Sequence, residues 1–124
     1  MPATAPASQE ALILDDNGAA YLEIWKAGVE LAGPGLFNAA AAHHIERATH
    51  WHQLTPDMAK IRKAIPNRSQ ADAAFLAVMA SMFNDTEGEK MLSKSGTTLG
   101  KLPLILGRKQ HGIVVALLTH HKGW

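Results

Sequence analysis

The chain has no cysteine among its 124 residues, which excludes disulfides, thiolate metal sites and a cysteine nucleophile. It also lacks any run of about 18 apolar residues, so the sequence predicts no membrane-spanning helix. The first ten residues hold neither lysine nor arginine nor an apolar block, and we therefore expect no secretory signal. These absences favour a protein of a reducing, bacterial-type cytoplasm that does not enter a membrane.

β-Branched residues are scarce, and this scarcity bears on the fold class. The sequence has 7 Ile and 4 Val against 21 Ala and 14 Leu. Ala and Leu lose little side-chain freedom in a helix, whereas β-branched residues favour strands. The composition predicts an all-α fold, a compact bundle of about five or six short helices. We expect residues 1–10 to form a disordered tail and residues 11–124 to form a single helical domain.

A stripe of apolar residues predicts the first helix. The stripe repeats at spacings of three and four and consists of Leu22, Trp25, Val29 and Ala32. We therefore predict a helix over residues 19–32, ended by the Gly-Pro-Gly triplet that follows it. An alanine-rich second helix is predicted over residues 36–53. A third is predicted from Thr55 to about Ile65, because Thr can cap a helix and the following Pro suits its first position.

The middle of the chain is the predicted hub of the fold. No charged residue occurs between positions 73 and 83, and Ser69 is suited to cap a helix that begins just before this stretch. The large apolar side chains fall on one side of such a helix; they are Phe75, Leu76, Met79, Met82 and Phe83. The other side is Ala and Ser, which allow a second helix to approach closely. The sequence therefore predicts a buried central helix here.

The last third of the chain is open to two interpretations. Thr86 and Glu89 have the spacing of a capping box, which predicts a short helix ending near Ser95. Beyond it, two apolar runs at 102–106 and 113–119 are separated by a basic, glycine-containing segment. A C-terminal hairpin would give this pattern, and an α+β fold is therefore the alternative. The basic turn before the glycine near the end favours helix instead.

Histidines are the candidate metal ligands. Four of the seven lie between positions 43 and 52, and on a helix His43, Glu46 and His50 would share one face. Imidazole and carboxylate suit zinc or iron, and His120 or His121 would complete a site if the fold brought them close. However, histidines seven residues apart lie about 10.5 Å apart along a helix axis, which is far for one ion. We favour half-buried or helix-capping histidines over a metal site.

A basic cluster is the candidate nucleic-acid-binding region. Its residues are Lys60, Arg62, Lys63 and Arg68, with Arg108 and Lys109 as possible additions. A helix, a turn and a second helix would carry the first four, which is the outline of a helix-turn-helix reader. The second helix nevertheless offers Phe, Leu and Met where polar side chains should meet base edges. We therefore favour a solvated face, with nucleic-acid association as the alternative.

Charge divides unevenly along the chain. Residues 1–58 hold seven acidic and two basic residues, a net charge of −5, and residues 59–124 hold ten basic and four acidic residues, a net charge of +6. The simpler explanation is that the two halves attract one another in the folded domain. The alternative is a basic surface for an acidic partner.

No catalytic or cofactor-binding motif is present, because the sequence has neither a Gly-x-Ser-x-Gly elbow nor a complete phosphate loop. Our leading hypothesis is a small non-enzymatic interaction or regulatory protein with no cofactor. It would bind a protein partner or form a homo-oligomer through an exposed apolar patch that includes Trp25, Trp51 or Trp124. Nucleic-acid association and a histidine metal site are the alternatives.

Overall fold

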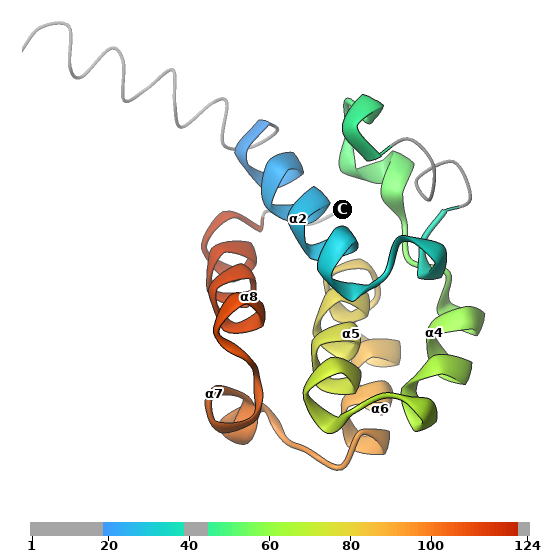
Figure 1. The fold of residues 1–124 in the computed structure, drawn as a ribbon, viewed down its shortest axis with the longest axis vertical. Coiled ribbons are helices and arrows are strands. Elements are labelled where there is room, and N and C mark those ends of the chain that lie inside the picture. Colours follow the sequence, from blue (N-terminus) through green and yellow to red (C-terminus); the bar gives the residue numbers. More distant parts are fainter. Residues whose placement is uncertain (1–18, 39–44, 122–124) are drawn as a thin grey trace, which may run out of the picture.

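The computed structural model describes residues 19–38 and 45–121. This part of the chain has six α-helices, joined by short 3-10 helices: α2 (Tyr21–Ala32), α4 (Met58–Ala64), α5 (Gln70–Phe83), α6 (Asp85–Lys94), α7 (Leu102–Ile105) and α8 (Arg108–His120) (Figure 1). It contains no strand, apart from one isolated bridge between Phe37 and Pro56. The all-α prediction is confirmed, and the alternative of a C-terminal hairpin is wrong. The predicted tail, residues 1–10, lies outside the described residues.

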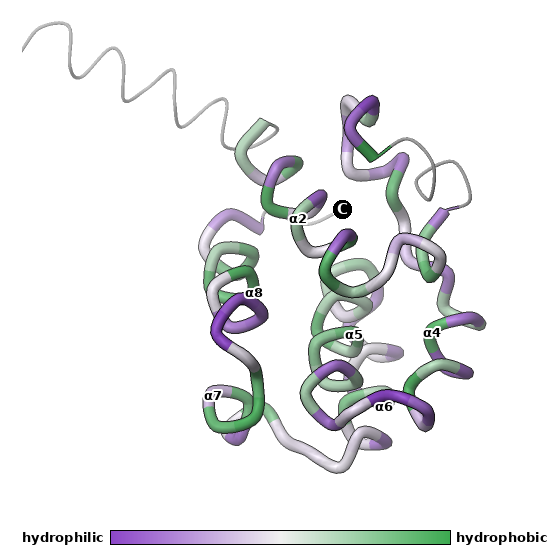
Figure 2. Tube along the Cα trace, in the orientation of Figure 1, coloured by the Kyte–Doolittle hydropathy of each residue, from purple (hydrophilic) through white to green (hydrophobic). Residues whose placement is uncertain are grey.

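Helix α5 is the centre of the bundle, as predicted. The hydroxyl of Ser69 caps it by accepting a hydrogen bond from the backbone of Asp72 at 3.1 Å. Nine of its residues are buried, and Figure 2 shows it as hydrophobic over most of its length. Around it lie α4 on one side and α8 on the other, with α6 packed closely along it (Figure 1). Phe83 departs from the prediction: it ends α5 and is 41% exposed rather than buried.

The apolar stripe of α2 faces this core, and all four of its predicted residues are buried. Trp25 is fully buried, and its indole Nε1 donates a hydrogen bond to the carbonyl oxygen of Leu54 at 2.9 Å. The prediction that Trp25 contributes to an exposed patch is therefore wrong. Its hydrogen bond instead fixes the 3-10 helix Trp51–Leu54 against α2.

The predicted continuous helix over residues 36–53 is wrong. Phe37 has an extended backbone, and this segment pairs with the one before α4: Asn38 N donates to Thr55 O, and Asp57 N donates to Leu36 O, both at 2.9 Å. Two 3-10 helices follow, Ile45–Arg47 and Trp51–Leu54, and His50 between them is extended. These tertiary hydrogen bonds and the burial of Phe37 against Trp25 outweigh the helix propensity of the segment. Residues 39–44, which hold most of its alanines, lie outside the described residues.

Two helix starts differ from their predicted caps. Asp57, rather than Thr55, caps α4 by accepting from the backbone N–H of Lys60 at 3.2 Å. Asn84, rather than Thr86, caps α6 by accepting from the backbone N–H of Glu87 at 3.1 Å. In both cases the capping residue is the last one with an extended backbone, and Thr86 already lies inside the helix. The sequence correctly predicts that each helix exists, but its prediction of the capping residue is wrong in both cases.

The C-terminal apolar runs form two helices, α7 and α8, that change direction at Leu106 and Gly107. Gln110 fixes this corner. Its Oε1 accepts from Gly107 N at 2.9 Å, and its Nε2 donates to the carboxylate of Asp72 on α5 at 2.8 Å. In the described ranges no helix has both the length and the hydropathy needed to span a bilayer.

Candidate functional site

Helices α2 and α8 lie side by side and run in opposite directions (Figure 1). The N-terminal end of α2 and the C-terminal end of α8 are joined by a hydrogen bond of 2.9 Å between the Tyr21 hydroxyl and Nδ1 of His121. Between the outer faces of the two helices lies an open groove of about 710 Å³, which we call the α2–α8 groove. Its walls are Glu23, Ile24, Ala27, Glu30 and Leu31 from α2 and Lys109, Gly112, Ile113 and Ala116 from α8.

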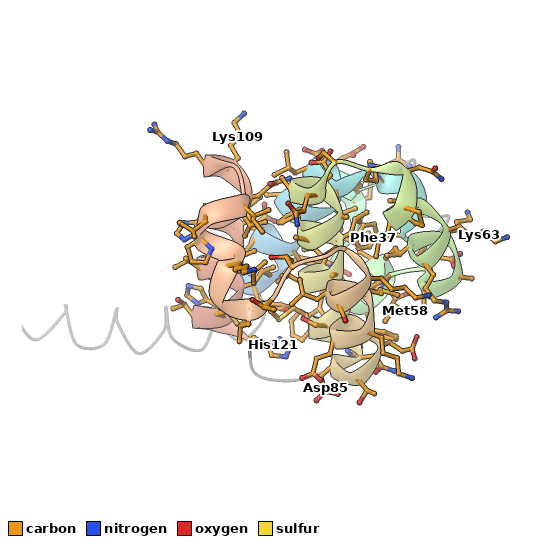
Figure 3. The ribbon with its side chains drawn as sticks, turned by 90° about the horizontal axis from the view of Figure 1, so that it is seen from below. Phe37, Met58, Lys63, Asp85, Lys109 and His121 are labelled. Carbon is orange, nitrogen blue, oxygen red and sulfur yellow. The ribbon has the colours of Figure 1, made fainter. Side chains whose placement is uncertain are left out.

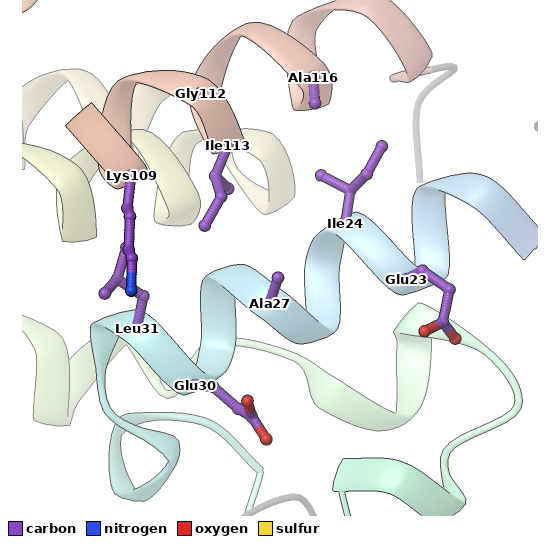
Figure 4. A pocket seen from close by; sticks show the side chains of 9 residues that line it. All are labelled: Glu23, Ile24, Ala27, Glu30, Leu31, Lys109, Gly112, Ile113 and Ala116. Carbon is purple, nitrogen blue, oxygen red and sulfur yellow. The ribbon is translucent and has the colours of Figure 1, made fainter.

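The floor of the α2–α8 groove is apolar and made largely of small residues. Ile24 and Ala27 face Ile113 and Ala116 across it (Figure 4). Leu31 is 41% exposed at one end, although it is a large aliphatic side chain. A Cβ added at Gly112 would have no heavy atom within 4 Å, so the groove is open at this point. An apolar surface of this shape, accessible to water, is typical of a binding site.

Charged residues lie along the rim. Glu23 and Glu30 are both exposed on α2, seven residues apart, and Lys109 is exposed at the N-terminal end of α8 (Figure 4). Glu23 also pairs with the largely buried Lys26, whose Nζ lies 3.5 Å from the Glu23 carboxylate. Because the Glu23 carboxylate itself is 72% exposed, it remains accessible to another cation. The α2 wall is therefore acidic, and the single groove-lining lysine stands on the opposite wall.

The α2–α8 groove is not among the sites that the sequence predicts. A signal for half of it exists: Ile24, Ala27 and Leu31 form a second helical stripe on α2, on a different side from the core stripe. On α8 the corresponding residues Gly112, Ile113 and Ala116 are mixed with other apolar residues. Their common direction becomes visible only once the helix is docked against α2.

The candidate basic residues fall into two groups. Lys60, Arg62 and Lys63 lie on α4, and Arg108 and Lys109 lie at the start of α8. Figure 3 shows Lys63 and Lys109 on opposite sides of the molecule. Arg62 pairs with Glu87 at 2.8 Å, and Arg68 donates to the carbonyl oxygen of Ala32 at the end of α2. The six candidate residues therefore do not form one continuous basic face, since the α4 group and the α8 group lie on opposite sides of the molecule.

The candidate metal ligands do not form a cluster in the described part of the chain, where no three His, Cys, Asp or Glu side chains are placed to hold one ion. His43 lies outside the described residues. Glu46 is exposed in a 3-10 helix, and His50 is extended, so the helical face that would have joined them is absent. That prediction of a shared helical face is wrong.

His50 and His121 have structural partners instead. His50 stacks on Trp51 with ring centroids 4.0 Å apart, and its Nδ1 accepts from the backbone of His52. Burial of the ring, and then the neighbouring His52, lower the pKa of His50. His121 is hydrogen-bonded to Tyr21, and burial lowers the pKa of His121 and raises that of Tyr21. His120 ends α8 in its last turn.

Exposed apolar side chains gather near the C-terminal helices rather than around tryptophans. Leu104 on α7 is 87% exposed, Leu99 just before it 73%, and Leu118 on α8 62%. Trp51 is half-buried against Tyr21, and Trp124 lies outside the described residues.

Comparisons with protein-family models, with curated proteins and with solved structures found no match to this chain.

Proposed function

We propose that this protein is a non-enzymatic protein-interaction domain whose α2–α8 groove binds an amphipathic helix that carries basic residues. The observation that supports the proposal is the pair of antiparallel walls, each with groove-lining residues at helical spacing. On α2 they stand at positions 24, 27 and 31, and on α8 at positions 109, 112, 113 and 116. Helix-in-groove recognition uses this spacing, since an apolar helix face presents anchors at i, i+3, i+4 and i+7.

The small floor residues support a helix as the occupant. Ala27, Gly112 and Ala116 hold no side-chain atom beyond Cβ, so a third helix can approach the two walls closely. Ile24, Ile113 and Leu31 are large enough to pack between its anchor side chains. Because these aliphatic groups already contact water, covering them gives a favourable free energy without first opening the core.

The charges support a basic occupant. Glu23 and Glu30 are about 10 Å apart along α2, two turns of helix, which is also the separation of two lysines at i and i+7 on a bound helix. The residues before α2 in this chain do not match, because positions 1–18 hold Glu10, Asp15 and Asp16 and no basic residue. The acidic rim therefore favours a segment from another protein over this one.

A pair of synthetic helical peptides tests the proposal. Both carry leucines at i, i+4 and i+7; one carries lysines on the flanking positions and the other glutamates. We expect the lysine peptide to bind and to shift the methyl resonances of Ile24, Leu31 and Ile113. Binding of both peptides with equal affinity, or shifts elsewhere only, would contradict the proposal.

Matched glycine substitutions provide the control. Gly112→Leu places a side chain in the groove without a steric clash, so it should abolish peptide binding while the domain stays folded. Gly35→Leu makes the same change at another position with open space around it, outside the groove, and should leave binding unchanged. If Gly112→Leu instead converts a dimer into a monomer by light scattering and the peptide does not bind, then the groove holds a second copy of this chain.

A further inference from the structure

A second hollow lies on another side of α8, away from the α2–α8 groove. It has a volume of about 440 Å³ and is enclosed by α5, α6, the segment before α7, and α8. Its inner walls include Val78 from α5, Leu92 from α6, Leu102 at the start of α7 and Val114 from α8. It is more enclosed than the α2–α8 groove, and its volume is typical of a small-molecule pocket. We call it the α5–α8 cavity.

The mouth of the α5–α8 cavity combines exposed apolar side chains with negatively charged ones. Leu99 and Leu118 line it although they are 73% and 62% exposed, so both can pack on a bound molecule. Asp85 and Glu89 at the start of α6 also line it and are exposed, and no lysine or arginine is among its lining residues. Figure 3 shows Asp85 and His121 along the same lower edge of the molecule.

From this arrangement we infer that the α5–α8 cavity binds a small amphiphilic cation, with an aliphatic or aromatic body inside and a protonated amine at the mouth. The apolar body packs against the buried side chains of Val78 and Val114, and it removes water from the more exposed Leu99 and Leu118. The ammonium group stays at the surface beside Asp85 and Glu89, where its hydration is largely kept. A carboxylate head group in that position would meet two like charges and no cation from the lining.

This inference is independent of the proposed function, because the two sites use different faces of α8. Gly112, Ile113 and Ala116 line the α2–α8 groove, whereas Val114, Leu118 and His121 line the α5–α8 cavity. Either site can therefore fail its test without affecting the other.

The test uses decylammonium, decanoate and decanol, each below its micelle-forming concentration. These three probes share one apolar chain and differ in the charge of the head group. We expect decylammonium to bind most tightly, with shifts of the Leu92, Leu99 and Leu102 methyl resonances in NMR spectra of the full chain. Equal affinity for all three probes would overturn the cationic class, and shifts confined to Ile24 and Ile113 would overturn the site.

Charged substitutions at the mouth complete the test. Leu118→Lys should weaken decylammonium binding about two- to fivefold relative to Leu118→Glu, which is the size of one exposed ion pair. Decanol should bind both variants alike. Leu104→Lys adds the same charge to a side chain that is 87% exposed and outside the cavity, and should leave decylammonium binding unchanged. Equal loss in Leu118→Lys and Leu118→Glu would overturn the inference.

Discussion

The hydroxyl of Tyr21 at the start of α2 lies 2.9 Å from Nδ1 of His121 at the end of α8, a hydrogen bond between residues a hundred positions apart. Tyr21 is 2% exposed and also packs edge-on against Trp51, with ring centroids 5.2 Å apart. One buried ring thus joins the last residues of the described chain to its first helix and to the segment before α4. The α2–α8 groove lies along the two helices that this contact holds together.

Removing the Tyr21 hydroxyl should weaken this junction. In Tyr21→Phe the ring and its packing remain, but the hydrogen bond to His121 is lost. We expect the free energy of unfolding to fall by about 1 kcal/mol, the usual net contribution of one such bond. Urea denaturation of the two proteins measures the change. An unaltered unfolding midpoint would contradict a stabilising role for this contact.

Stability should depend on pH through His121. Because its pKa is lowered in the folded state, the folded protein binds fewer protons than the unfolded protein, and the free energy of unfolding rises with pH. His50, whose pKa is also lowered, contributes with the same sign. Stability is therefore greatest above the unfolded pKa of about 6.5 and decreases as the pH falls through that value toward the lower folded pKa.

Urea titrations at pH 7.5, 6.5 and 5.5 check this dependence. The His121→Gln variant keeps a polar side chain but cannot titrate, so its unfolding free energy should fall less over the same range. If the variant loses stability as steeply as the original chain, then His121 is not a source of the effect.

Gly88 should tolerate no side chain. It is buried where α6 crosses α5, and a Cβ added there would overlap Ser81, including its backbone nitrogen at 2.6 Å. Gly88→Ala should therefore destabilise the domain by about 1–3 kcal/mol, although alanine is the better helix former. The comparison is Gly112→Ala, where the added methyl meets nothing and should stabilise by up to about 1 kcal/mol. Thermal and urea unfolding of both variants should give shifts of opposite sign.

Gln110 should anchor the first turn of α8. It is only 8% exposed and hydrogen-bonds both Gly107 and Asp72, so Gln110→Ala loses two interactions at once. We expect a cost of about 1–2 kcal/mol and faster amide hydrogen exchange in residues 108–112. Gln70→Ala removes one hydrogen bond of an exposed glutamine, to Gly96, and should cost less. Equal costs for the two variants would contradict an anchoring role of Gln110.

The sequence identified the helices whose patterns are local. The apolar stripe of α2 predicts which side of that helix is buried, and the uncharged stretch of α5 predicts that this helix is buried in the centre. Each pattern lies within about fourteen residues, and both predictions are confirmed. The segment at 36–53 was mispredicted because its alanines favour helix locally. Its actual course is decided by partners that are distant in sequence: Thr55 and Asp57, which hydrogen-bond Asn38 and Leu36, and Trp25, whose ring packs against Phe37. Propensity carries no information about such partners.

The amino-acid sequence alone determined that this chain is helical, lacks thiol chemistry and has its centre between positions 73 and 83, because composition and periodicity act within single segments. Only the tertiary structure decided which surfaces remain hollow. The α2–α8 groove and the α5–α8 cavity each arise where helices far apart in the chain lie together without filling the space between them. That outcome depends on how side chains from several elements fit against one another, and no single segment specifies it.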